Sequence, residues 1–106
     1  MLHVGPIRLD LERRRVRCQG REARLTPRLT RLLKVLMDNH GDVLERGQLF
    51  RNVWNTEYTG DTRTLDVHIS WLRQAVEEDP RHPRFLKTVR GVGYRLDISP
   101  DSQENQ

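Results

Sequence analysis

Residues 64–74, TLDVHISWLRQ, carry an apolar pattern that fits one secondary structure. Leu65, Ile69, Leu72 and Val76 recur at spacings of three and four residues. Because successive residues of an α-helix are turned by about 100°, these four side chains share one face. The pattern therefore predicts a helix, from about residue 62 to 78, that buries a single stripe and leaves its other side to solvent or to a partner.

The opposite side of this predicted helix carries two apolar residues. Val67 and Trp71 lie four residues apart, among the polar residues Arg63, Ser70 and Gln74. The major groove of DNA admits one helix and displays both hydrogen-bonding edges and thymine methyl groups, so Val67 is suited to a thymine methyl. A protein-contact patch explains the same pattern, and so do scattered surface residues. Helical spacing leaves all three readings open.

More polar side chains surround this outward side. Thr64 and Ser70 carry hydroxyls that donate or accept hydrogen bonds at base edges. His68 and Arg73 fall on opposite sides of the helix, between the core stripe and the outward side. From there they are placed to reach the phosphate walls on either side of a groove.

Composition limits the chain to one modest core. It has 106 residues, of which 35% are hydrophobic, and this predicts one domain. The net charge is +4 and 17 of the 19 basic residues are Arg, whose planar fork matches phosphate oxygens and guanine edges. A GC-rich genome produces the same bias.

The single cysteine, Cys18, excludes an internal disulfide and favours a reducing, cytoplasmic setting. We expect no membrane span and no signal peptide.

The remaining segments predict a sheet, two further helices and a hairpin. Alternating residues predict a small antiparallel sheet over 3–25, and Thr26 is a favourable N-cap for a helix that Gly41 ends. The other elements are a short extended link at 43–44, a second helix at 46–54, a polar loop at 55–61, and strands at 85–89 and 94–98.

A helix–loop–helix followed at once by a β-hairpin is the arrangement of a winged helix. We therefore predict an α+β winged-helix domain over residues 1–98. The tail at 99–106 contains no apolar residue and is expected to be disordered.

The turn of the predicted hairpin, Arg90-Gly91-Val92-Gly93, supports the DNA reading. It places Arg90 near the tip of a protruding ribbon, and a narrow minor groove attracts an inserted Arg. The G-x-G pattern joins two strands and opens no helix, so the dinucleotide-binding fingerprint is absent. Glycines that serve only the turn are compatible with the DNA reading.

Catalysis finds little support in the sequence. His3, His40, His68 and His82 show no metal-ligand spacing with one another or with Cys18. No Ser or Cys nucleophile signature is present. We predict a non-enzymatic protein without cofactor or metal. The serious competitor to DNA binding is a winged helix that docks a protein through its third helix.

Three segments resemble the C-terminal effector domain of the OmpR/PhoB response regulators. They are TRTLDVHISWLRQAVEEDPRHPRFLKTVRGVGYRL, LTPRLTRLLKVLMDNHGDVL and VGPIRLDLERRRVRCQGREARL, and together they cover about residues 3–97. The resemblance implies a winged helix-turn-helix with an N-terminal four-stranded antiparallel sheet, three helices and a C-terminal hairpin wing. It implies sequence-specific binding of double-stranded promoter DNA, in a two-component regulatory system.

The resemblance also implies partners and individual roles. By motif position, Thr64, Val67, Ser70 and Trp71 would face bases, Arg63, His68, Arg73, Thr88, Tyr94 and Trp54 would contact the DNA backbone, and Arg90 would enter the minor groove. The loop residues Thr56, Glu57, Tyr58 and Thr59 would contact RNA polymerase. Trp54 and Tyr94 are equally compatible with plain packing roles. The isolated domain is expected to be a monomer that forms head-to-tail dimers on DNA. A receiver domain would precede it if the chain is a fragment rather than a stand-alone regulator.

Position 71 departs from the pattern of the resemblance. Many members of that family carry a basic or small polar residue there, and Trp71 cannot form the bidentate guanine contact that Arg forms. An indole offers one N–H donor and a large apolar face. Either the operator is read differently, or Trp71 makes a protein contact, for example with Tyr58.

Overall fold

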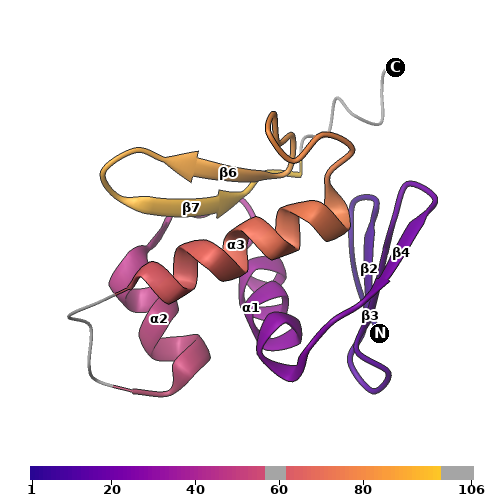
Figure 1. The fold of residues 1–106 in the computed structure, drawn as a ribbon, viewed down its shortest axis with the longest axis horizontal. Coiled ribbons are helices and arrows are strands. Elements are labelled where there is room, and N and C mark those ends of the chain that lie inside the picture. Colours follow the sequence, from indigo (N-terminus) through magenta and orange to yellow (C-terminus); the bar gives the residue numbers. More distant parts are fainter. Residues whose placement is uncertain (57–61, 99–106) are drawn as a thin grey trace.

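The computed structural model describes residues 1–56 and 62–98 and confirms the predicted order of sheet, three helices and hairpin (Figure 1). The expected disordered tail at 99–106 and most of the polar loop lie outside the described residues. The elements are β1 (Leu2–Val4), β2 (Ile7–Asp10), β3 (Arg15–Cys18), β4 (Arg21–Arg24), α1 (Pro27–Asp38), β5 (Leu44–Glu45), α2 (Arg46–Trp54), α3 (Arg63–Val76), β6 (Leu86–Val89) and β7 (Gly93–Leu96).

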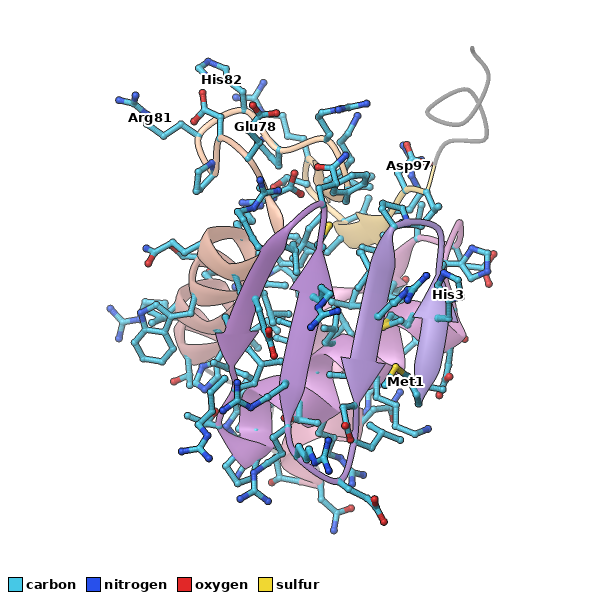
Figure 2. All side chains as sticks on the ribbon, turned by 90° about the vertical axis from the view of Figure 1, so that its right-hand side faces the viewer. Met1, His3, Glu78, Arg81, His82 and Asp97 are labelled. Atoms are coloured by element: carbon cyan, nitrogen blue, oxygen red, sulfur yellow. The ribbon has the colours of Figure 1, made fainter. Side chains whose placement is uncertain are left out.

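The N-terminal sheet is a four-stranded antiparallel meander in the order β1-β2-β3-β4. Its two central strands alternate between the core and solvent, and their inward residues are Ile7, Leu9, Val16 and Cys18. This period of two is what a sheet with one covered face requires. Figure 2 looks onto the outer face, with Met1 and His3 at the β1 edge and the helices behind the sheet.

Helix α1 begins as its sequence predicts. The hydroxyl of Thr26 accepts a hydrogen bond of 3.1 Å from the backbone N–H of Leu29, so one of the unpaired donors of the first turn is satisfied. The helix ends at Asp38, with Asn39 as its C-cap, so the expected end at Gly41 lies beyond the cap. Gly41 has the predicted left-handed φ of +89°, and its N–H donates to the carbonyl of Leu96.

Helices α2 and α3 bury the stripes that their spacing predicts. In α2 the buried residues are Leu49, Phe50 and Val53, and in α3 they are Leu65, Ile69, Leu72 and Val76. One hydrophobic cluster joins these stripes to α1, the N-terminal sheet and the hairpin. The buried hydrophobic residues of the described segments therefore form one shared core.

The hairpin belongs to a three-stranded sheet rather than standing alone. Its order is β5-β7-β6, and Leu44 of the predicted extended link lies opposite Tyr94. The strands run over 86–89 and 93–96 instead of the expected 85–89 and 94–98. Phe85 and Asp97 still share a backbone hydrogen bond of 2.6 Å just outside the ladder. The third strand therefore joins the turn end of the hairpin to the start of α2.

Across residues 1–56 and 62–98, no helix combines the length and apolar content needed to cross a membrane.

Candidate nucleic-acid interface

Helix α3 crosses one broad face of the molecule and leaves one side uncovered (Figure 1). The four residues of its core stripe are at most 1% exposed. Six residues of the opposite side are exposed, as predicted: Arg63, Thr64, Val67, Ser70, Trp71 and Gln74. Val67 is 45% and Trp71 48% exposed. This helix therefore presents a mixed polar and apolar side to a partner.

A row of aromatic rings supports this side from the core. Phe50 and Trp54 of α2 stack with ring centroids 4.8 Å apart. Trp54 meets His68 of α3 edge-on at 4.9 Å, and His68 meets Trp71 at 5.1 Å. The Nδ1 of His68 lies 2.9 Å from the carbonyl oxygen of Thr64, which accepts its hydrogen bond. Trp71 thus rests on a ring that is itself held in place.

Trp54 is half-buried and has packing partners on two sides. Besides its two ring neighbours, the guanidinium of Arg28 in α1 lies 5.1 Å from the centre of its indole. Arg28 also donates a hydrogen bond of 3.3 Å to the carbonyl of Val53, near the end of α2. These contacts give Trp54 a structural role, and its predicted contact with the DNA backbone stays a prediction.

Asp66 connects α3 to both of its neighbours, a relationship that the sequence did not reveal. Its Oδ1 accepts a hydrogen bond of 2.5 Å from the hydroxyl of Tyr94 in β7 and an ion-paired hydrogen bond from Arg46 in α2. Arg46 also donates to the hydroxyl of Thr62 at 2.5 Å. The N-terminal turn of α3 is therefore tied to α2 and to the hairpin at one carboxylate.

The electrostatics of this cluster follow from its burial and bonds. Burial, with the hydrogen bond to Asp66 next in importance, raises the pKa of Tyr94 to about 12. Partial burial alone would raise the pKa of Asp66, but the hydrogen bonds from Arg46 and then Tyr94 lower it below its ordinary value. Tyr94 is therefore neutral and Asp66 charged around neutral pH. Tyr94 is only 7% exposed, so its predicted contact with a phosphate would involve little more than the rim of the phenol.

Arg73 joins the C-terminal half of α3 to the wing. Its Nε donates to the carbonyl of Leu86 at 3.0 Å, and its Nη2 donates to the hydroxyl of Thr88 at 2.8 Å. Its guanidinium also lies 5.8 Å from the centre of the Tyr94 ring. The two predicted backbone-contacting residues Arg73 and Thr88 are thus brought together, and both remain accessible, since Thr88 is exposed and Arg73 partly so.

The wing turn lies at the same end of the molecule as the N-terminus of α3 (Figure 1). Arg90 is exposed, Gly91 has a φ of +76°, and the N–H of Val92 closes the turn on the carbonyl of Val89 at 2.9 Å. A left-handed residue at this point favours glycine. The structure therefore leaves Arg90 accessible, in a turn at the same end of the molecule as the N-terminus of α3.

Most of the residues predicted to contact RNA polymerase lie outside the part of the chain that the structure describes. Glu57, Tyr58 and Thr59 lie outside the described residues, and Thr56 is half-buried. Within residues 1–56 and 62–98, no three His, Cys, Asp or Glu side chains gather as the ligands of a metal ion would.

Comparisons with known proteins agree with this geometry. The family described as "Transcriptional regulatory protein, C terminal" matches residues 20–96. The sensory transduction protein RegX3 of Mycolicibacterium smegmatis is 50% identical over 97 residues, which are 92% of this chain and 42% of RegX3. The chain thus spans less than half the length of this relative.

Solved structures show the same fold. The DNA-binding domain of Klebsiella pneumoniae RstA, in complex with RstA box, superimposes with a TM-score of 0.79 at 28% identity over 92% of this chain and 97% of that domain. The Thermotoga maritima response regulator DrrB, an OmpR/PhoB homologue, has a TM-score of 0.76 at 30% identity over 91% of this chain and 43% of DrrB.

Proposed function

The chain belongs to the family of winged-helix DNA-binding domains that form the C-terminal part of OmpR/PhoB-type transcriptional regulators, and we propose from this premise how it reads DNA. In the proposal, α3 lies in the major groove of promoter DNA and the wing places Arg90 in the adjacent minor groove. The domain is the effector part of a two-component regulator. It positions itself on a sequence and performs no chemistry on the DNA.

One observation carries this proposal: the wing turn is exposed and lies at the same end of the molecule as the N-terminus of α3, whose outward side is exposed along its length. A helix has room in a major groove about 12 Å wide, and the neighbouring minor groove is within reach of a short ribbon. The RstA domain, whose structure was solved with RstA box, has the same fold over nearly its whole length.

The side chains divide into two roles in this proposal. The base-facing residues are Thr64, Val67, Ser70 and Trp71. Contacts to the sugar–phosphate backbone come from Arg63, His68, Arg73, Thr88, Tyr94 and Trp54. Backbone contacts fix the register of the domain, whereas base contacts select the sequence.

The partners beyond DNA follow from family membership. We propose that the isolated domain is a monomer, that two copies bind direct repeats head to tail, and that a receiver domain precedes the domain in the whole regulator. The residues Thr56, Glu57, Tyr58 and Thr59 are proposed to contact RNA polymerase.

Salt-dependent binding tests the proposal. The affinity of the domain for a duplex taken from an unbiased selection of bound fragments should fall steeply with salt, with a log–log slope of about −0.9 per phosphate contacted. Arg90→Ala should weaken binding to all duplexes alike. Val67→Ala and Ser70→Ala should instead change the preferred base, by about 1–3 kcal/mol per contact.

Arg8→Ala is the matched control, because it removes the same charge from the outer face of the N-terminal sheet. It should affect affinity less than Arg90→Ala does. If Arg90→Ala, Val67→Ala and Ser70→Ala all left affinity and base preference unchanged, the exposed side of α3 would be a protein-docking surface instead.

A further inference from the structure

We propose that Val67 and Trp71 form one apolar reader that recognises the C5-methyl groups of two nearby thymines. The inference rests on the proposed function and deepens it by naming the base chemistry that this chain selects. It concerns two features of α3, the pairing of its exposed apolar residues and the support beneath Trp71.

The first feature is the spacing of the pair. Residues four apart on a helix share a face and are separated by about 6 Å along the axis. Both side chains are nearly half exposed, although neither belongs to the core stripe. The base edges of the major groove offer one apolar group, the thymine methyl. An apolar pair that spans about 6 Å fits methyl groups no more than about two base-pair steps apart, since bases rise by about 3.4 Å.

The second feature is the rigidity of Trp71. Its indole leans on His68, with ring centroids 5.1 Å apart and planes inclined at 61°. His68 is fixed in turn by its bond to the carbonyl of Thr64 and by the edge of Trp54 at 82°. A recognition residue whose rotamer is already held loses less conformational freedom on binding. The row of rings from Phe50 to Trp71 therefore holds the indole ready for a base edge.

The chemistry of the indole selects against guanine. Guanine presents the acceptors N7 and O6 in the major groove, and Trp71 has one N–H donor to offer them. An indole ring that covers N7 and O6 of guanine would leave at least one of these acceptors without a hydrogen bond, and the buried acceptor would carry a desolvation penalty. Cytosine lacks the methyl group at C5. Thymine, with its C5-methyl group, is the base that matches the apolar face of the indole at this position.

Deoxyuridine gives a direct test because it removes the methyl group and keeps the base pair. In the best duplex from the selection, each thymine is replaced in turn by deoxyuridine and the Kd is measured. We expect a loss of about fourfold at two positions no more than about two steps apart, which is the effect of one buried methyl group. Trp71→Ala should abolish the loss at one position, and Val67→Ala at the other.

Gln74→Ala is the matched protein control, since Gln74 lies on the same exposed side but is polar and has no assigned contact with DNA. It should retain both deoxyuridine losses. Replacing deoxycytidine by 5-methyldeoxycytidine where a contacted thymine has been changed to cytosine should restore about fourfold in Kd. Trp71→Arg should move the preference at its position to guanine, by fivefold or more, because Arg forms the bidentate contact.

Thermal unfolding of each variant establishes that it folds, and a substitution at a half-exposed position is expected to leave the fold intact. If every deoxyuridine duplex bound like its parent while the steep salt dependence remained, the inference would fail and the proposed function would stand. Loss of salt-dependent duplex binding in the unaltered domain would overturn both. Deoxyuridine losses that persist in Trp71→Ala and Val67→Ala would also overturn the inference.

Discussion

The hydroxyl of Tyr94 donates a hydrogen bond of 2.5 Å to Oδ1 of Asp66 and so joins the wing to helix α3. The same carboxylate is paired with Arg46 at the start of α2. Three elements that are separate in the chain therefore meet at one side chain. In the proposed complex α3 and the wing occupy different grooves, so the angle between them decides whether both can bind at once.

Removing the hydroxyl of Tyr94 should destabilise the domain without changing its core. Tyr94→Phe keeps the buried ring and takes away one hydrogen bond to a charged group, so we expect a loss of about 1–2 kcal/mol in the free energy of unfolding by urea. Asp66→Asn should cost a similar amount. In a double-mutant cycle of Tyr94→Phe with Asp66→Ala, which removes the acceptor, the two changes should couple by at least about 0.5 kcal/mol, because they act on one bond. Strict additivity would show that the bond contributes nothing to stability.

The pH dependence of stability should report the charge of Asp66. Since the pKa of Asp66 is lower in the folded state than its ordinary value of 3.8, its contribution is complete above that value and is lost as the pH falls through the folded-state pKa. The difference in unfolding free energy between the unaltered domain and Asp66→Asn should therefore be constant from pH 7 to about pH 5 and shrink below 3.8. Urea unfolding at several pH values measures it, and a difference that grew on acidification would contradict the assignment.

The contribution of Tyr94 to stability should be lost at high pH, whereas that of Asp66 is lost at low pH. Its pKa is raised from 10.0 to about 12, so its contribution is complete below 10 and is lost as the pH rises toward 12. Tyr94→Phe should accordingly show a weaker loss of stability above pH 10 than the unaltered domain. Equal alkaline profiles would show that Tyr94 titrates alike in the folded and unfolded chain.

Gly93 sets the close approach of the wing to α2, and a side chain there should break it. A Cβ atom at Gly93 would lie 2.0 Å from the carbonyl oxygen of Leu44 and 3.0 Å from the backbone nitrogen of Arg46. Both are backbone atoms that cannot turn aside, so Gly93→Ala should cost about 3 kcal/mol and detach β5 from β7. Amide hydrogen exchange of the two strands, with urea unfolding, measures both effects.

Gly20 provides the comparison for that variant. It has a φ of +85°, but apart from its two neighbours in the chain no heavy atom of the described residues lies within 4 Å of the position of its Cβ. Gly20→Ala should therefore cost only the strain of the left-handed backbone, about 1–2 kcal/mol, and leave the exchange of β5 unchanged. If the two substitutions cost the same, the contact between Gly93 and Leu44 would not be important for the wing.

The sequence predicted the parts of this fold that repeat locally. The stripe from Leu65 to Val76 fixed the orientation of α3, and the exposure of Val67 and Trp71 followed from it because a helix has one period. Thr26 marked the start of α1 for a similar reason, since its cap bond spans three residues. Such features need no knowledge of the rest of the chain.

The contacts that connect distant segments could not be predicted in this way. Asp66 lies 20 residues from Arg46 and 28 from Tyr94, and no local pattern indicates that the three meet. The strand β5 has two residues, too few to show an alternation. The sequence therefore indicates an extended link at this point but not its pairing with β7. The support of Trp71 by His68 and Trp54 likewise depends on how α2 packs on α3. Tertiary packing decided each of these.

Arg73 makes it possible to separate a structural contact from a phosphate contact at one residue. Two of its five N–H donors are used by Leu86 and Thr88, and because the side chain is partly exposed it is placed to reach a phosphate as well. Arg73→Gln removes the charge, whereas Arg73→Lys keeps it; neither reproduces the paired bonds to the wing. Both should lose about 1 kcal/mol in unfolding free energy. In DNA binding, Arg73→Gln should reduce the magnitude of the log–log salt slope by about 0.9 and Arg73→Lys should leave it unchanged. A lost phosphate contact releases fewer counterions and must therefore lower the magnitude of the slope. If the slope in Arg73→Gln equalled that of the unaltered domain, Arg73 would only hold the wing against α3.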